Sequence, residues 1–197
     1  PSGPLFFTGI TAARSRAMKS AHAGIQYLLI MKDIVILAMH GIPPKDFPQQ
    51  ELAEFFRLHS SIRAGRHKQE DQERCEFLDR KMRNWPRNRE NDPFHAASLE
   101  LASNLSAVSG HEVIVGYNEF CAPSLEDALQ AAADSMPEKI VVATPMMTRG
   151  GEHAEKEIPM LINAFNERNP GITVTYAWPF DISHVTKFLS DHIATFM

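Results

Sequence analysis

Four short apolar runs, each followed by a segment with helical spacing, constrain the fold of this chain more than any other feature. The first run, DIVILAMH at residues 33–40, is apolar on both faces, which is typical of a buried central strand in a parallel sheet. The others cover residues 112–120, 139–147 and 172–180. Because strands that alternate with helices form parallel sheets with right-handed crossovers, the sequence predicts an α/β fold. We expect a doubly wound, mainly parallel four-stranded sheet with helices on both faces.

The segments between the runs predict the helices. Three helices are expected after the later strands, over residues 124–135, 154–169 and 181–196. The interval between the first two strands is longer and predicts three more, over residues 49–65, within 66–90, and over 92–110. Pro159 is expected to kink the helix of residues 154–169 near its start.

A densely charged segment at residues 66–90 separates the first two strands. Its thin apolar stripe consists of Phe77, Leu78, Met82 and Trp85. Acidic and basic residues interleave along it, which favours a solvated helix over a patch that binds nucleic acid. We therefore predict a helical insertion after the first strand, over about residues 60–92, within a single α/β domain of residues 31–197.

Residues 1–30 are predicted to be an N-terminal extension outside that domain. The first 32 residues contain four basic residues and no acidic residue, a composition that also fits a targeting segment. The chain begins with proline, and Met31 stands before the first strand. We therefore expect the extension to be sequence upstream of the natural start.

Composition argues against several classes of function. The net charge of −4 does not favour nucleic acid as a partner. Cys75 and Cys121 are far apart, so we expect neither a disulfide framework nor a thiolate zinc site, and we predict a reducing, cytoplasmic location. Lys32 and Asp33 interrupt the longest apolar stretch, which argues against a membrane span. The motifs GxSxG, GxxxxGK and GxGxxG are missing, so an ordinary hydrolase or nucleotide-binding enzyme is not favoured.

Two histidines and a carboxylate follow the first three predicted strands. His40 ends the first strand, Glu119 lies at the end of the second, and His153 follows the third after a Gly-Gly turn. The fourth strand is followed by Trp178, Pro179 and Phe180, and then by His184. Ligands of open parallel sheets bind outside the carboxyl ends of the strands, so these side chains are expected to meet at one edge of the sheet.

Two imidazoles and a carboxylate are suitable ligands for a divalent transition metal. His153 is expected near a helix N-terminus, whose dipole keeps the ring neutral. Nearby glutamates that would attract a cation are Glu152, Glu155 and Glu157. Each candidate also fits an ordinary role, since a histidine after a strand is often a turn or capping residue and Glu119 fits a solvated loop. His184 fits a packing or capping residue, and surface positions are expected for His59, His67, His95, His111 and His192.

Three motifs in this chain resemble one known family. The segments VILAMHG, NEFCAPSLEDAL and VVATPMMTRGGEHAEKEIP occur in the order found in the CbiX family of class II tetrapyrrole chelatases, which includes sirohydrochlorin cobaltochelatases. The resemblance covers about residues 33–193. It implies that His40 and His153 are metal-binding and catalytic, with Glu119 as the carboxylate beside them. It also implies a small doubly wound domain, and a homodimer for chains that hold one such domain.

The implied reaction is the insertion of a divalent metal, with cobalt first and nickel or iron as alternatives, into sirohydrochlorin or a related tetrapyrrole without ATP. The metal is then a substrate, no permanent cofactor is expected, and cobalamin biosynthesis is one implied pathway. A non-catalytic protein that binds or delivers a tetrapyrrole or a metal is the alternative. The chain departs from the family in its helical insertion, and it has His-Gly-Ile-Pro-Pro where the family commonly has His-Gly-Ser-Arg.

A planar, polycarboxylate macrocycle needs an apolar wall and cationic partners. We predict the wall from the apolar and aromatic residues near the strand ends, namely Met146, Met147, Tyr117, Trp178 and Phe180. Lys45 and Arg149 lie near the same edge and are predicted to pair with substrate carboxylates.

Overall fold

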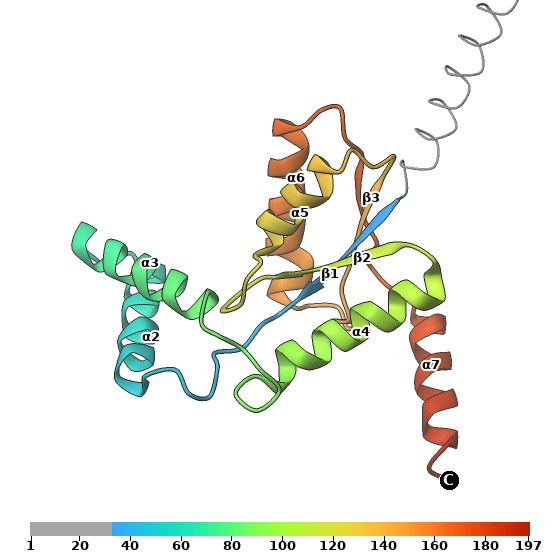
Figure 1. Ribbon diagram of the computed structural model, residues 1–197, viewed down its shortest axis with the longest axis horizontal. Helices are drawn as coiled ribbons and strands as arrows, with labels where there is room; N and C mark the ends of the chain where they lie inside the picture. The colour runs from blue at the N-terminus through green and yellow to red at the C-terminus, as the bar shows by residue number, and fades with distance from the viewer. Residues whose placement is uncertain (1–32) are drawn as a thin grey trace, which may run out of the picture. The chain divides into compact units, whose positions relative to one another are not determined.

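A parallel four-stranded sheet forms the centre of the fold in the computed structural model, which describes residues 33–197 (Figure 1). The strands are β1 (Ile34–Met39), β2 (Glu112–Tyr117), β3 (Ile140–Ala143) and β4 (Val174–Tyr176). They pair in the order β2-β1-β3-β4, all parallel, so the first strand is central, as predicted. The extension predicted over residues 1–30 lies outside the described residues.

Helices cover both faces of this sheet, which confirms the doubly wound prediction. On one face lie α5 (Leu125–Asp134) and α6 (Ile158–Arg168), and on the other lies α4 (Pro93–Ser109) (Figure 1). The first face is the larger core, and its fully buried members include Ile36, Ala128, Leu129, Ile140, Val142 and Ile158. The α4 face buries Leu37, Met39, Ala102, Val115, Tyr117 and Cys121.

Local signals set the ends of these helices. Ser124 accepts a hydrogen bond from the backbone N–H of Asp127 and caps α5. Asp92 caps α4 through the N–H of His95, and Gly110 ends that helix with a left-handed φ of 74°. These helix ends lie within one residue of the predicted ones.

All four strands are shorter than the apolar runs that predicted them, and the difference is largest for β2, β3 and β4 (Val174–Tyr176). β3 ends at Ala143, and Pro145 lies two residues further on without an N–H to donate to the ladder. β2 ends at Tyr117, although the N–H groups of Asn118 and Glu119 still bond to the carbonyls of Met39 and His40, both at 2.9 Å. Phe120, which has a left-handed φ of 59°, then turns the chain away.

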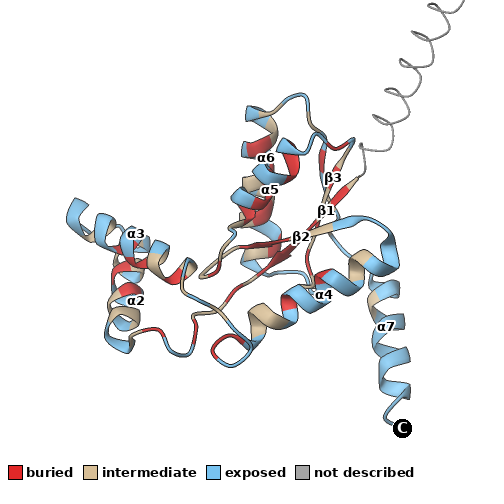
Figure 2. Ribbon diagram, in the orientation of Figure 1, coloured by how far each residue is buried: buried red, intermediate tan, exposed pale blue. Residues whose placement is uncertain are grey.

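Two helices between β1 and α4 form a hairpin, α2 (Gln49–Arg63) and α3 (Gln69–Arg83) (Figure 1). The insertion predicted over about residues 60–92 covers the end of α2 and all of α3. The two helices bury residues on the sides that face each other (Figure 2). Together with Phe47 before α2 they form an apolar cluster of Phe47, Phe55, Leu58, Cys75, Leu78 and Met82. Most of α3 is open to solvent, as predicted for a solvated helix, and its apolar stripe packs against α2 through Cys75, Leu78 and Met82. Phe77, which was predicted to belong to the apolar stripe, is 48% exposed. The buried face of α3 consists of Cys75, Leu78 and Met82, whose spacing of three and four residues places them on one side of the helix.

The last helix, α7 (Ile182–Ala194), has no buried residue (Figure 2). Cys75 and Cys121 are both free and buried. Within residues 33–197, no helix combines the length and the apolar character needed to cross a membrane.

Candidate metal centre

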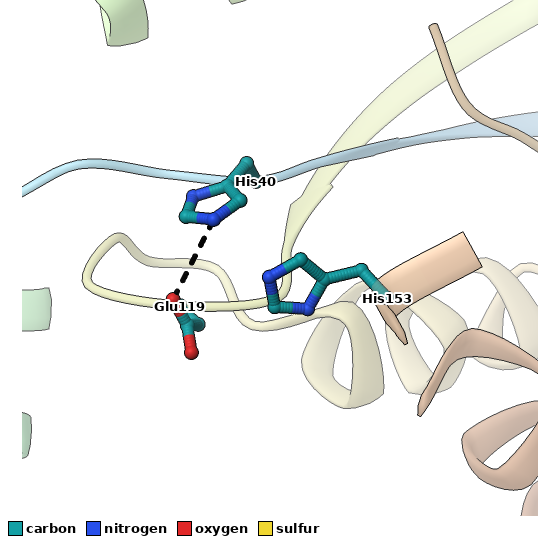
Figure 3. Close-up of side chains that lie close together, drawn as sticks. All are labelled: His40, Glu119 and His153. Carbon is teal, nitrogen blue, oxygen red and sulfur yellow. Dashed lines mark ion pairs between the residues drawn. The ribbon is translucent and has the colours of Figure 1, made fainter. Parts of the chain in front are cut away.

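His40, Glu119 and His153 lie together at the carboxyl edge of the sheet, as the sequence predicted (Figure 3). Each offers one ligand atom, and these atoms all lie within 4.8 Å of one another. His40 Nε2 is 3.7 Å from Glu119 Oε2. The rings of His40 and His153 are nearly perpendicular, with centroids 4.6 Å apart. Three residues from distant parts of the sequence therefore form one cluster.

The backbone places His40 and Glu119 side by side. The N–H of Glu119 donates to the carbonyl of His40, so the two residues are tied one step beyond the regular strands. Gly41 follows His40 with a φ of 92°, and a Cβ on it would fall on the carbonyl oxygen of Glu119. This close approach of the two turns requires glycine at position 41.

The hydrogen bond of the His40 ring defines which nitrogen is free. His40 Nδ1 lies 2.5 Å from the carbonyl oxygen of Gly41. A carbonyl can only accept, so Nδ1 carries the hydrogen, and in the neutral ring Nε2 is the nitrogen with the lone pair. That lone pair belongs to the nitrogen that faces Glu119.

His153 is fixed in the same way by an acidic partner. It begins a π-helical turn, His153–Glu157, that precedes α6. Pro159, which cannot donate a backbone hydrogen bond, follows this wider turn as the second residue of α6 (Ile158–Arg168). Within this turn His153 Nδ1 lies 2.5 Å from Glu157 Oε2. The carboxylate accepts from Nδ1, so Nε2 is again the free nitrogen.

The three glutamates around His153 have different roles. Glu152 pairs with Arg63 at 3.4 Å, and Glu155 pairs with Arg149 at 3.8 Å. Only Glu157 contacts the imidazole. The sequence predicted only that these acids together would attract a cation. In the structure one of them, Glu157, is the specific partner of His153.

This arrangement can hold a metal loosely. Zinc-like ions bind imidazole and carboxylate at about 2.0–2.2 Å in tetrahedral sites, so neighbouring ligand atoms are separated by about 3.4 Å. The distance of 3.7 Å between His40 Nε2 and Glu119 Oε2 is near that value. The ligand atoms of the three residues lie within 4.8 Å of one another, so a small movement of the side chains brings them all to the spacing of a bound ion. The side chains are also partly open to solvent, with 43%, 29% and 20% exposed for His40, Glu119 and His153. Three ligands with solvent access leave positions free for another ligand.

A model of the CbiX family matches residues 89–194, which include Glu119 and His153. The chain belongs to the CbiX family. Family membership supports metal insertion into a tetrapyrrole as the class of reaction. A search of curated proteins finds no match.

Two solved structures are similar to this CbiX-family chain. One is a CbiX protein from Marinobacter aquaeolei VT8, which is 16% identical over 83% of this chain and 95% of that chain, with a TM-score of 0.49. The other is the sirohydrochlorin chelatase SirB from Bacillus subtilis subspecies spizizenii, solved in complex with cobalt. It is 19% identical over 76% of this chain and 44% of that chain, with a TM-score of 0.43.

A cavity of about 660 Å³ lies beside the metal cluster of this CbiX-family chain. Glu119, Phe120 and Glu157 line one side of it, and residues of the α2–α3 hairpin line the other. His59 and His67, which were expected to have surface roles, belong to that second wall. Sequence reasoning missed this wall because it depends on how the hairpin folds back towards the sheet.

The prediction for Tyr117 is wrong. Its side chain is fully buried on the α4 face of the sheet and stacks on His95 at a centroid distance of 5.5 Å. Burial raises the pKa of Tyr117 to about 12 and lowers the pKa of His95. Val113, Val115 and Tyr117 are every second residue of β2 and share one face of the sheet, which is the face that α4 covers.

The other predicted contacts have mixed surroundings. Arg149 and Trp178 line a second hollow of about 570 Å³, together with Gly150, Glu155 and Pro159. Met146 packs against the larger core, and Met147 is half-buried. Lys45 and Phe180 are exposed. His184 is also exposed, at the start of α7, and lies outside the metal cluster.

Proposed function

We propose that this chain inserts a divalent metal ion into sirohydrochlorin or a related tetrapyrrole without hydrolysing ATP, with cobalt as the first metal to test. The observation that carries the proposal is the cluster of His40, Glu119 and His153 with its two free Nε2 atoms. The adjoining cavity and the membership of the CbiX family support it.

The chemistry of the ligands suits a metal that is a substrate. Neutral imidazole and a single carboxylate bind cobalt, nickel and iron, but they do not hold an ion as thiolates do. An ion held by His40, His153 and Glu119 keeps coordination positions for water or for the nitrogens of the macrocycle. It can therefore leave with the product.

Insertion also requires that two pyrrole nitrogens lose their protons. In the proposed sequence, the macrocycle lies against the cluster and its nitrogens replace the protein ligands one by one. Each imidazole that releases the metal regains a lone pair on Nε2 and can then accept a proton. At His153, the carboxylate of Glu157 on Nδ1 stabilises the imidazolium that forms. Glu119 is the third group able to take a proton.

The test is an anaerobic absorbance assay with sirohydrochlorin and cobalt(II), compared with nickel(II) and iron(II). The wild-type protein, His153→Ala and His184→Ala are measured together, because His184 is an exposed histidine outside the cluster. We expect catalytic turnover in the wild type and His184→Ala, and its loss in His153→Ala. A rate no higher than the spontaneous background with every metal would contradict the proposal. Stoichiometric retention of ligand without turnover would instead support a binding or delivery protein.

A further inference from the structure

One buried arginine links the two turns that carry His40 and Glu119. The side chain of Arg87, in the segment between α3 and α4, is only 5% exposed. Its Nη1 donates to the carbonyl of Ile42 at 3.0 Å, and its Nη2 donates to the carbonyl of Phe120. Ile42 lies two residues after His40, and Phe120 directly follows Glu119. A single guanidinium therefore bridges the turn that follows His40 and the turn that follows Glu119.

Arg87 is itself held in place by further contacts. Asp92 is fully buried and accepts from Arg87 Nη1 through Oδ2, while its Oδ1 accepts from the N–H of His95 at 2.8 Å and caps α4. Arg87 Nη2 also donates to the carbonyl of Met82 at the end of α3 at 3.0 Å. Contacts to the end of α3 and to the N-cap of α4 thus fix the planar guanidinium, which also donates to the turns after His40 and Glu119.

The turn after β2 needs such support. Phe120 has a left-handed backbone, an uncommon and costly conformation for a residue other than glycine. A second arginine, Arg83, donates to the carbonyls of Asn118 and Cys121 at 3.2 and 3.1 Å. The carbonyl groups on both sides of Glu119 therefore accept from two arginines, one at the end of α3 and one just after it.

We propose that Arg87 is a positioning residue for metal insertion, which holds the carbonyls of Ile42 and Phe120 and thereby sets the separation of His40 and Glu119. This inference rests on the proposed function. It gives the α2–α3 hairpin a task in the reaction, because Arg87 follows α3 and donates to the carbonyl of Met82 at its end. Lysine cannot replace Arg87, since one ammonium group cannot donate in a planar fork to carbonyls on two turns and to Asp92.

The test measures the affinity for cobalt(II) alone, by titration, at a temperature where every variant is folded. Arg87→Lys is expected to bind cobalt about 10- to 100-fold more weakly, the loss typical of groups that orient metal ligands. In the insertion assay, its kcat is expected to fall by a similar factor with little change in the KM for the tetrapyrrole. Ile162→Ala is the control, because Ile162 packs on α6 in the larger core, and it should lose stability but keep the wild-type affinity.

Wild-type cobalt affinity and kcat in folded Arg87→Lys would overturn the inference. Should Arg87→Lys fail to fold, Arg83→Gln provides the second test, since Arg83 holds the same turn and is partly exposed. Arg83→Gln is expected to lower the affinity for cobalt. An unchanged affinity would refute the inference that these carbonyl contacts position the metal ligands. If wild-type protein binds cobalt but never inserts it, the proposed function fails while the affinity data still decide the role of Arg87.

Discussion

Replacing Gly41 by alanine tests whether the contact between the two turns sets the metal cluster. Gly41 has a φ of 92°, so alanine adds backbone strain of about 1–3 kcal/mol. Its Cβ would also fall on the carbonyl oxygen of Glu119, which must move by roughly an ångström to make room. A displacement of about 1 Å at reacting groups can lower a rate about 100-fold. We therefore predict a loss of stability together with a loss of insertion rate of that size.

Gly110→Ala is the matched control for this prediction. Gly110 also has a left-handed φ, of 74°, but a Cβ on it meets no atom within 4 Å. It should cause only the part of the stability loss that comes from the left-handed backbone, measured by urea denaturation, and leave the initial rate of cobalt insertion unchanged. If Gly41→Ala kept a rate within about threefold of the wild type, the reasoning about the close turns would be refuted.

Two further predictions concern groups that the structure places in defined surroundings. Glu157→Gln removes the negative charge beside His153 Nδ1, so the affinity for cobalt should fall about 10- to 100-fold in a titration. An unchanged affinity would mean that Glu157 does not orient the ring. Burial raises the pKa of Cys121 from 9.0 to about 11 and that of Tyr117 from 10.0 to about 12. Both groups bind their protons more tightly in the folded state, so the free energy of unfolding should fall as the pH rises from about 9 towards 12. Urea denaturation at several values of pH checks this, and a flat profile there would be inconsistent with their burial.

The features that the sequence predicted correctly depend on period and order along the chain. The unbroken apolar run of β1 favours a strand that is covered on both faces, and such a strand lies in the middle of a parallel sheet. Parallel strands bring their carboxyl ends to one edge, so His40, Glu119 and His153 could be assigned to one place without knowing any distance. Their actual separation required the structure, because it depends on the turns at Gly41 and Phe120.

The features that were missed or wrong depend on contacts between distant segments. Tyr117 was assigned to the pocket because it lies near the end of its strand, and the sequence does not show that α4 covers its face of β2. Arg87 stands in a segment rich in charges, and nothing in its neighbours distinguishes a buried arginine from a solvated one. The pair of His153 and Glu157 did have a sequence signal, the i,i+4 spacing on a helix, which could have singled out Glu157.

The most direct test of the central claim is anomalous diffraction from crystals of the protein grown with cobalt(II). The account predicts one strong cobalt peak among His40, Glu119 and His153, with the Nε2 atoms of both histidines facing the ion. A cobalt peak elsewhere, or ligation through the Nδ1 atoms that bond to Gly41 and Glu157, would contradict it.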